Sequence, residues 1–132
     1  MWMTRTIEAP AAAAWELLVD VRRWPEWGPS LRSATLDGGR SRIDLGSTGR
    51  LRPLVGPSLG FRIDALGEDL GGPGGGVRSW SWRVAGVSAT GHRVEDLGDG
   101  RCRVGFRVPL LAAPYALVCA EALRRIERIL TA

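Results

Sequence analysis

The order of hydrophobic and polar positions predicts that the chain opens with a strand and a helix. Residues 3–8 favour a short strand, and Pro10 stands where a first helical residue tolerates the loss of its N–H. In "PAAAAWELLVD", residues 10–20, apolar side chains recur at helical spacing and form one core-facing stripe: Ala11, Ala14, Trp15 and Leu18. Because proline restricts the residue before it, this helix must stop before Trp24–Pro25, and a short second helix or turn is expected at about 21–25.

From residue 30 the period changes to two, which is typical of strands. Apolar residues alternate with polar ones in "LGFRIDA", "RSWSWRV" and "RCRVGFRV", and turn sequences such as "DGG" and "GDG" separate the segments. This pattern predicts an antiparallel sheet of about six strands with one covered face and one wet face. The glycine-rich "GEDLGGPGGGV" leads into a strand rather than a helix, so it predicts a long, mobile hairpin connection at residues 67–76 and not a phosphate-binding loop.

The last segment predicts a long helix over residues 112–130 that covers the sheet. At 100° per residue one side collects the apolar stripe: Tyr115, Cys119, Ala122, Leu123, Ile126, Ile129 and Leu130. The opposite side carries Glu121, Arg124, Arg125 and Arg128. The bulky aliphatic end of the stripe should pack tightly, whereas the smaller and more polar beginning should leave a space against the sheet.

Length and composition indicate one globular domain, residues 1–132. The hydrophobic fraction of 45% and the charged fraction of 24% are ordinary for such a domain and exclude disordered and collagen-like classes. No apolar run approaches the ~20 residues of a membrane span, and the N-terminus lacks the apolar core of a secretion signal. We therefore expect a cytoplasmic protein.

The net charge of +4 raises the question of an anionic partner. All 18 positive side chains are arginines, and they are scattered along the chain rather than massed in one segment. The pattern favours solvated faces, and we expect no nucleic-acid partner.

Three segments stand out in the order strand, two helices, six strands and closing helix: "APAAAAWELLVDVRRWPEW" near the start, "WSWRV" in a middle strand and "GHRVEDLGDGRCRV" across a hairpin. With this order, they resemble the polyketide cyclase/dehydrase branch of the START-like (SRPBCC) superfamily. The resemblance implies an α+β helix-grip fold, in which a curved antiparallel sheet of six to seven strands wraps around the C-terminal helix. It also implies a deep apolar cavity between sheet and helix.

Aromatic side chains are the strongest candidates for a ligand site. Inward-facing positions on such a fold would line an apolar pocket with a few polar tips: Trp27, Phe61, Trp80, Trp82, His92, Phe106, Tyr115 and Cys119. The same side chains could instead form plain core. Trp24 and Trp27 in "DVRRWPEWGPS" are interpreted as anchors of the short second helix, with Trp27 also placed to wall the cavity mouth.

Catalytic chemistry has few candidates in this chain. The chain has one histidine, so a Ser-His-Asp triad could be built around His92 alone, and a two-histidine zinc site is impossible. No metal or other cofactor is expected. His92 should face inward, either as a satisfied core residue or as a group that transfers protons to a bound carbonyl compound, with Tyr115 as its partner candidate. Cys102 and Cys119 are expected to be free buried thiols.

Three hypotheses about function follow. The first is a protein that binds a hydrophobic or polycyclic small molecule in the cavity, as a monomer or homodimer. The second is a polyketide cyclase/dehydrase-type enzyme that acts on an aromatic polyketide, with His92 and Tyr115 handling protons. The third is a protein-interaction module whose cavity is filled.

Overall fold

The computed structural model describes residues 1–72, 75–109 and 114–132. In chain order these residues form β1 (Trp2–Ile7), α1 (Ala11–Val19), the 3₁₀ turn η1 (Val21–Arg23), α2 (Trp24–Trp27), β2 (Leu31–Leu36), β3 (Thr48–Pro53), β4 (Leu59–Gly72), β5 (Gly75–Val84), β6 (Val87–Gly98), β7 (Arg101–Arg107) and α3 (Ala116–Thr131). The predicted order of a strand, two short helices, further strands and a closing helix is confirmed. Pro10 is the N-cap of α1 rather than its first helical residue.

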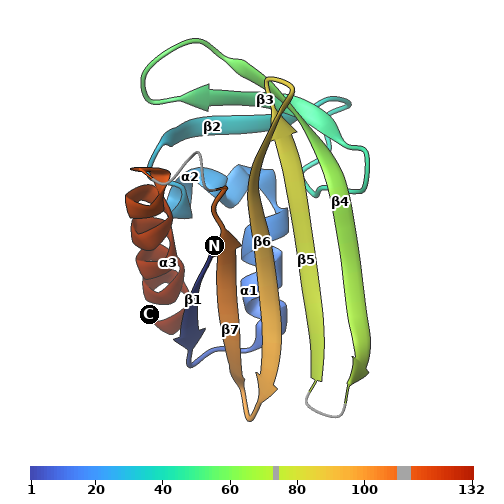
Figure 1. Ribbon diagram of the computed structural model, residues 1–132, viewed down its shortest axis with the longest axis vertical. Helices are drawn as coiled ribbons and strands as arrows, with labels where there is room; N and C mark the ends of the chain where they lie inside the picture. Colours follow the sequence, from blue (N-terminus) through green and yellow to red (C-terminus); the bar gives the residue numbers. More distant parts are fainter. Residues whose placement is uncertain (73–74, 110–113) are drawn as a thin grey trace.

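The strands form one antiparallel sheet in the order β1-β7-β6-β5-β4-β3-β2. In Figure 1, β2 and β3 cross the upper end of the long strands β4 to β7, so the sheet is strongly bent. Register shifts interrupt the pairing of β4 with β5 and of β5 with β6. Such bulges increase the local twist of a strand, which allows the sheet to curve.

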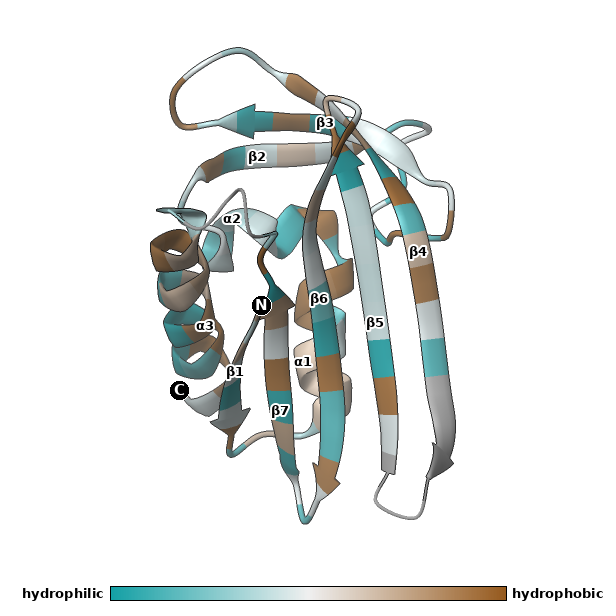
Figure 2. Ribbon diagram, viewed as in Figure 1, coloured by the Kyte–Doolittle hydropathy of each residue, from teal (hydrophilic) through white to brown (hydrophobic). Residues whose placement is uncertain are grey.

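The helices cover the inner face of the bent sheet. α1 packs on β6 and β7, α2 packs on β2, and α3 packs on β1, β7 and the two shorter helices. Figure 2 shows the alternation of hydrophobic and hydrophilic positions along the long strands. The α+β helix-grip fold is confirmed. The sequence predicts that the last helix covers the sheet, whereas in the structure α1 covers β6 and much of β7.

The closing helix differs from its prediction at the N-terminal end. The α-helix begins at Ala116 after 3₁₀ residues 114–115, and residues 112 and 113 lie outside the described residues. Tyr115 is 41% exposed, so the prediction that it starts the buried stripe is wrong. The stripe begins one turn later, at Cys119, because a residue ahead of the first helical turn does not share the face of the helix that follows.

The predicted long hairpin connection at residues 67–76 is also wrong. β4 continues to Gly72 and β5 begins at Gly75, which pairs with Gly72, while residues 73–74 lie outside the described part. The glycines favour a loop, yet the backbones of β4 and β5 remain paired through this segment. The side chains of Glu68 on β4 and Arg78 on β5 also form a cross-strand ion pair at 3.6 Å, which supports the pairing.

Candidate functional site: the aromatic cluster

Two tryptophans fasten α2 to the end of α1. The indole Nε1–H of Trp24 donates to the carbonyl oxygen of Leu18 at 2.8 Å, and that of Trp27 donates to the carbonyl oxygen of Leu17 at 3.0 Å. The last carbonyls of a helix have no partner within the helix, so the two indoles satisfy groups that would otherwise be buried unpaired. This geometry supports the interpretation of Trp24 and Trp27 as anchors.

The same two rings join a larger set on the inner face of the sheet, which we call the aromatic cluster. Its members are each less than a tenth exposed and come from α2, β4, β5, β6 and β7: Trp24, Trp27, Phe61, Trp80, Trp82, His92 and Phe106. The rings of Trp24 and Trp80 are stacked with centroids 5.3 Å apart, and those of Trp80 and His92 are stacked at 3.8 Å. Trp80 is therefore stacked with two other rings of the cluster.

His92 is held by hydrogen bonds on both ring nitrogens. Nδ1 lies 3.4 Å from the carbonyl oxygen of Trp80, which can only accept, so Nδ1 carries the proton. Nε2 then accepts from the hydroxyl of Thr90 at 3.1 Å, and the same hydroxyl accepts from Nε1–H of Trp82 at 3.1 Å. This chain of three hydrogen bonds fixes one neutral tautomer of His92.

Burial also sets the charge of His92. Desolvation lowers the pKa of the imidazole from 6.5 to about 3, and the positive charge of Arg107 acts in the same direction. The imidazole is thus neutral at pH 7, and neither nitrogen has a free lone pair or proton to offer a substrate. The geometry suits a fixed polar wall better than a group that transfers protons.

One polar atom in the cluster lacks a partner. Nε1–H of Trp80 is buried and meets no acceptor among the described residues. A buried donor without an acceptor costs about 1 to 3 kcal/mol, so such a group calls for an explanation such as a bound water or ligand. The indole nitrogens of Trp24, Trp27 and Trp82 all have acceptors, which makes Trp80 the exception within the cluster.

The structure brings together most of the side chains that the sequence proposed for a ligand site. Six of the eight lie in the aromatic cluster: Trp27, Phe61, Trp80, Trp82, His92 and Phe106. Cys119 is buried on α3, where desolvation raises the pKa of its thiol to about 11. Tyr115 lies at the surface, and its hydroxyl is 3.0 Å from Oγ of Ser30.

Sequence reasoning assigned no ligand contact to two members of this arrangement. The sequence predicts Trp24 only as an anchor. In the structure its indole both donates to the carbonyl oxygen of Leu18 at the end of α1 and stacks on Trp80 in the cluster. Thr90 could have been found from its position, since it stands two residues before His92 and therefore shares the inner face of β6.

An ion pair also lies between β1 and α3. Arg5 shares the less exposed face of β1 with Met3 and Ile7, and its guanidinium meets the carboxylate of Glu127 on α3 at 2.8 Å. Both side chains are a third or more exposed, so the pair contributes little to stability. It ties the closing helix to the edge strand.

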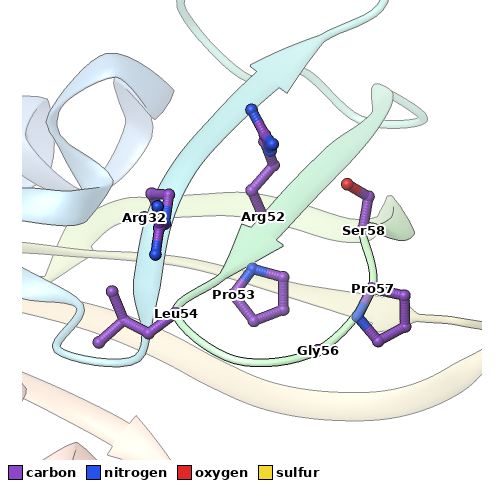
Figure 3. Close-up of a pocket in the computed structure, with 7 residues that line it drawn as sticks. All are labelled: Arg32, Arg52, Pro53, Leu54, Gly56, Pro57 and Ser58. Carbon is purple, nitrogen blue, oxygen red and sulfur yellow. The ribbon is translucent and has the colours of Figure 1, made fainter.

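Two hollows lie at the surface of the described part of the sheet. One hollow of about 360 Å³ is lined by residues of β2, β3 and the β3–β4 loop, including Arg32, Arg52 and Ser58 (Figure 3). A second hollow lies over β3, β4 and the β5–β6 turn and includes Arg50 and Arg62. Both lie away from α3.

Among the described residues, no three His, Cys, Asp or Glu side chains converge to form a metal site. No helix in the described ranges is long and apolar enough to cross a membrane.

Comparisons with known proteins identify the family of this fold. A family model described as "Polyketide cyclase / dehydrase and lipid transport" matches residues 2–131. No curated protein matches the sequence.

Several solved structures share the architecture. The di-domain ARO/CYC StfQ from the steffimycin biosynthetic pathway is similar over 98% of this chain, with a TM-score of 0.67 and 16% identity, and the chain spans 44% of StfQ. The Zhui aromatase/cyclase from Streptomyces sp. R1128 is similar over 99% of this chain and 92% of its own, with a TM-score of 0.64 and 15% identity. A hypothetical protein from Helicobacter pylori reaches a TM-score of 0.71 at 12% identity, over 98% of this chain and 88% of its own. At these identities the likeness shows the fold alone.

Proposed function

The chain belongs to the polyketide cyclase/dehydrase and lipid-transport family, and from that premise we propose that it binds a flat hydrophobic small molecule against Trp80 in the aromatic cluster. The observation that carries the proposal is the buried Nε1–H of Trp80, which lies among aromatic rings without an acceptor in the described part of the chain. A flat ligand with a carbonyl or hydroxyl oxygen at its edge would pack against the rings with that oxygen in the plane of the Trp80 indole, where it accepts from Nε1–H. The ligand class is therefore a polycyclic compound that carries an acceptor oxygen.

In this proposal a ligand reaches Trp80 by displacing Trp24, which packs against the same ring. Its ring is fully buried and stacked on Trp80, so ligand entry requires that Trp24 move out with α2. Exposing a buried tryptophan costs about 3 to 5 kcal/mol, which reduces the apparent affinity roughly 10²- to 10⁴-fold relative to a preformed pocket. Weakening the anchor of Trp24 should therefore strengthen binding.

The test compares two flat tricyclic probes that differ in one acceptor, 9-fluorenone and fluorene, by equilibrium dialysis and tryptophan emission. The wild-type protein should bind fluorenone about 5- to 10-fold more tightly than fluorene, because only the ketone oxygen can accept from Trp80. Trp80→Phe should remove this preference. Trp27→Phe is the matched control and should keep it, because the Trp27 indole already donates to Leu17.

Two outcomes would reject the proposal. One is the absence of binding of either probe up to its solubility. The other is an unchanged preference for fluorenone in Trp80→Phe. Trp24→Phe adds a second check, since it keeps a ring but loses the hydrogen bond to Leu18, and it should bind fluorenone about fivefold more tightly if Trp24 must leave.

The remaining hypotheses rank below binding. The similar aromatase/cyclases make an enzyme of aromatic polyketide cyclisation the second candidate, but the neutral, doubly hydrogen-bonded His92 and the exposed Tyr115 argue against roles in proton transfer. An interaction module with a filled interior is the third, and it is what a failure of both probes would favour. A cytoplasmic location and a monomeric or homodimeric state remain predictions.

A further inference from the structure

The outer face of the bent end of the sheet carries a concentration of arginines. Five exposed arginines from β2, β3, β4 and β5 make up what we call the arginine face: Arg32, Arg50, Arg52, Arg62 and Arg83. They are spread over the sequence, and the strand order β5-β4-β3-β2 brings them onto neighbouring strands. The two surface hollows lie on this face, one lined by Arg32 and Arg52 and the other by Arg50, Arg62 and Arg83.

Strand register places these like charges side by side. Arg62 of β4 pairs directly with Arg83 of β5. The bulge in β2 inserts Arg32 next to Ser33, which pairs with Arg52, and Figure 3 shows Arg32 and Arg52 on adjacent strands of the same hollow. Like charges directly opposite each other destabilise a sheet, so the pairing of Arg62 with Arg83 does not contribute to the stability of the fold.

Few carboxylates neutralise the arginine face. Asp64 lies 3.5 Å from Arg83, and Asp37, which accepts from the hydroxyl of Thr48 at 2.7 Å, lines the second hollow. Among the side chains that the structure describes, the other four arginines form no ion pair. The face therefore has an excess of positive charge and can bind a surface of negative charge.

Aliphatic side chains protrude beside these arginines. Leu54 and Val55 in the β3–β4 loop are 53% and 89% exposed, and Leu54 lines the same hollow as Arg32 and Arg52. Val87 follows the β5–β6 turn and is 67% exposed. In Figure 1 the β3–β4 loop and the β5–β6 turn lie at the same upper end of the molecule. Apolar tips and basic side chains thus occur together on one end.

We propose that this end of the molecule docks on an anionic lipid membrane surface, with the arginines on lipid phosphates and carboxylates and the loop that carries Leu54 and Val55 in the interfacial region. Basic residues near an anionic leaflet each raise affinity several-fold, and exposed aliphatic side chains gain by entering the headgroup boundary. A nucleic acid would use the charge but leave the aliphatic tips in water, and none of the arginine-face residues or tips is an aromatic on which a base could stack. The inference goes beyond the proposed ligand site and does not rest on it.

Vesicle sedimentation tests the proposal with the full chain. Vesicles of phosphatidylcholine with 30% phosphatidylserine should pull down the wild-type protein at low salt, and vesicles of pure phosphatidylcholine should bind it at least tenfold less. Arg32→Gln with Arg52→Gln should weaken binding to the anionic vesicles by about tenfold or more. Val55→Ser should weaken it several-fold and make the remaining binding more sensitive to salt, because only the electrostatic part is left.

A matched control removes the same charge elsewhere. Arg124→Gln with Arg128→Gln changes two exposed arginines of α3 that lie near Glu121 and should leave vesicle binding within twofold of wild type. Equal loss in this control, equal binding to both vesicle types, or no binding at all would overturn the proposal. The proposal would also be overturned if Val55→Ser bound anionic vesicles with wild-type affinity and duplex DNA displaced the protein from them. Those two results together would indicate a nucleic-acid surface.

Discussion

Lowering the pH from 7 to 5 should destabilise the folded protein through one side chain, His92. The chain has a single histidine, so no other imidazole titrates in this range. In the unfolded chain its pKa is close to 6.5, whereas burial lowers the pKa in the folded protein to about 3. Between these values the unfolded state binds a proton that the folded state does not, and the free energy of unfolding must fall as the pH falls.

The size of the effect follows from the two pKa values. The loss of stability is absent well above pH 6.5, grows below it by at most ~1.4 kcal/mol per pH unit, and levels off near pH 3. Between pH 7 and pH 5 the free energy of unfolding should drop by about 2 kcal/mol. In a domain of this size the melting midpoint should drop by roughly 6 to 10 °C. Asp20, whose pKa is lowered by its hydrogen bonds from Arg22, titrates below this range.

Urea unfolding at several pH values measures this dependence. His92→Phe keeps a flat ring beside Trp80 but cannot be protonated, so its stability should be lower and nearly constant from pH 7 to pH 5. If His92→Phe does not fold, His92→Gln provides the same comparison. A wild-type stability that does not change between pH 7 and pH 5, or an equal slope in the variants, would refute the view that His92 is buried and neutral.

Other side chains give equally specific expectations for stability and reactivity. Trp24→Phe should lower the free energy of unfolding by about 1 to 2 kcal/mol through loss of the hydrogen bond to α1, and Trp24→Ala by about 3 to 5 kcal/mol, both measured by urea unfolding. Gly49→Ala should cost about 3 kcal/mol, because a Cβ there would lie 2.2 Å from the carbonyl oxygen of Thr35, and a variant of wild-type stability would contradict the tight pairing of β2 and β3. Cys102 and Cys119 should react with an aromatic disulfide at pH 8 only as fast as the protein opens, since burial raises the pKa of each thiol to about 11, and rapid reaction of either would show an accessible site.

Much of the fold could be predicted because alternation along a half-covered strand is a local property. In β7, Cys102, Val104 and Phe106 are buried as the period of two required. The prediction of a loop was wrong for the glycine-rich segment that ends β4, because a high glycine content indicated a turn although the backbone there is paired with β5. The prediction for Tyr115 was also wrong, because the periodicity cannot tell where the first turn of a helix begins.

The candidate site was predictable only in part. The inward faces of the strands placed Trp80, Trp82 and His92 together, since each lies on the buried side of its own strand. The tautomer of His92 and the missing acceptor of Trp80 depend on distances across strands, which a sequence does not contain. The arginine face was missed for the same reason, because register and a bulge, rather than sequence proximity, bring its members together.

The indole N–H signals of the six tryptophans in a ¹H–¹⁵N spectrum test ligand binding in the aromatic cluster most directly. Trp80→Phe and Trp24→Phe assign two of these signals, and Trp2, which is 41% exposed and stacked under Arg93, serves as an internal control. On titration with 9-fluorenone the Trp80 signal should move furthest, as its N–H gains an acceptor, and the Trp24 signal should follow, while Trp2 stays in place. If the Trp80 and Trp24 signals remain fixed up to the solubility of the probe, or if only Trp2 moves, the cluster is a filled core and the binding function is contradicted.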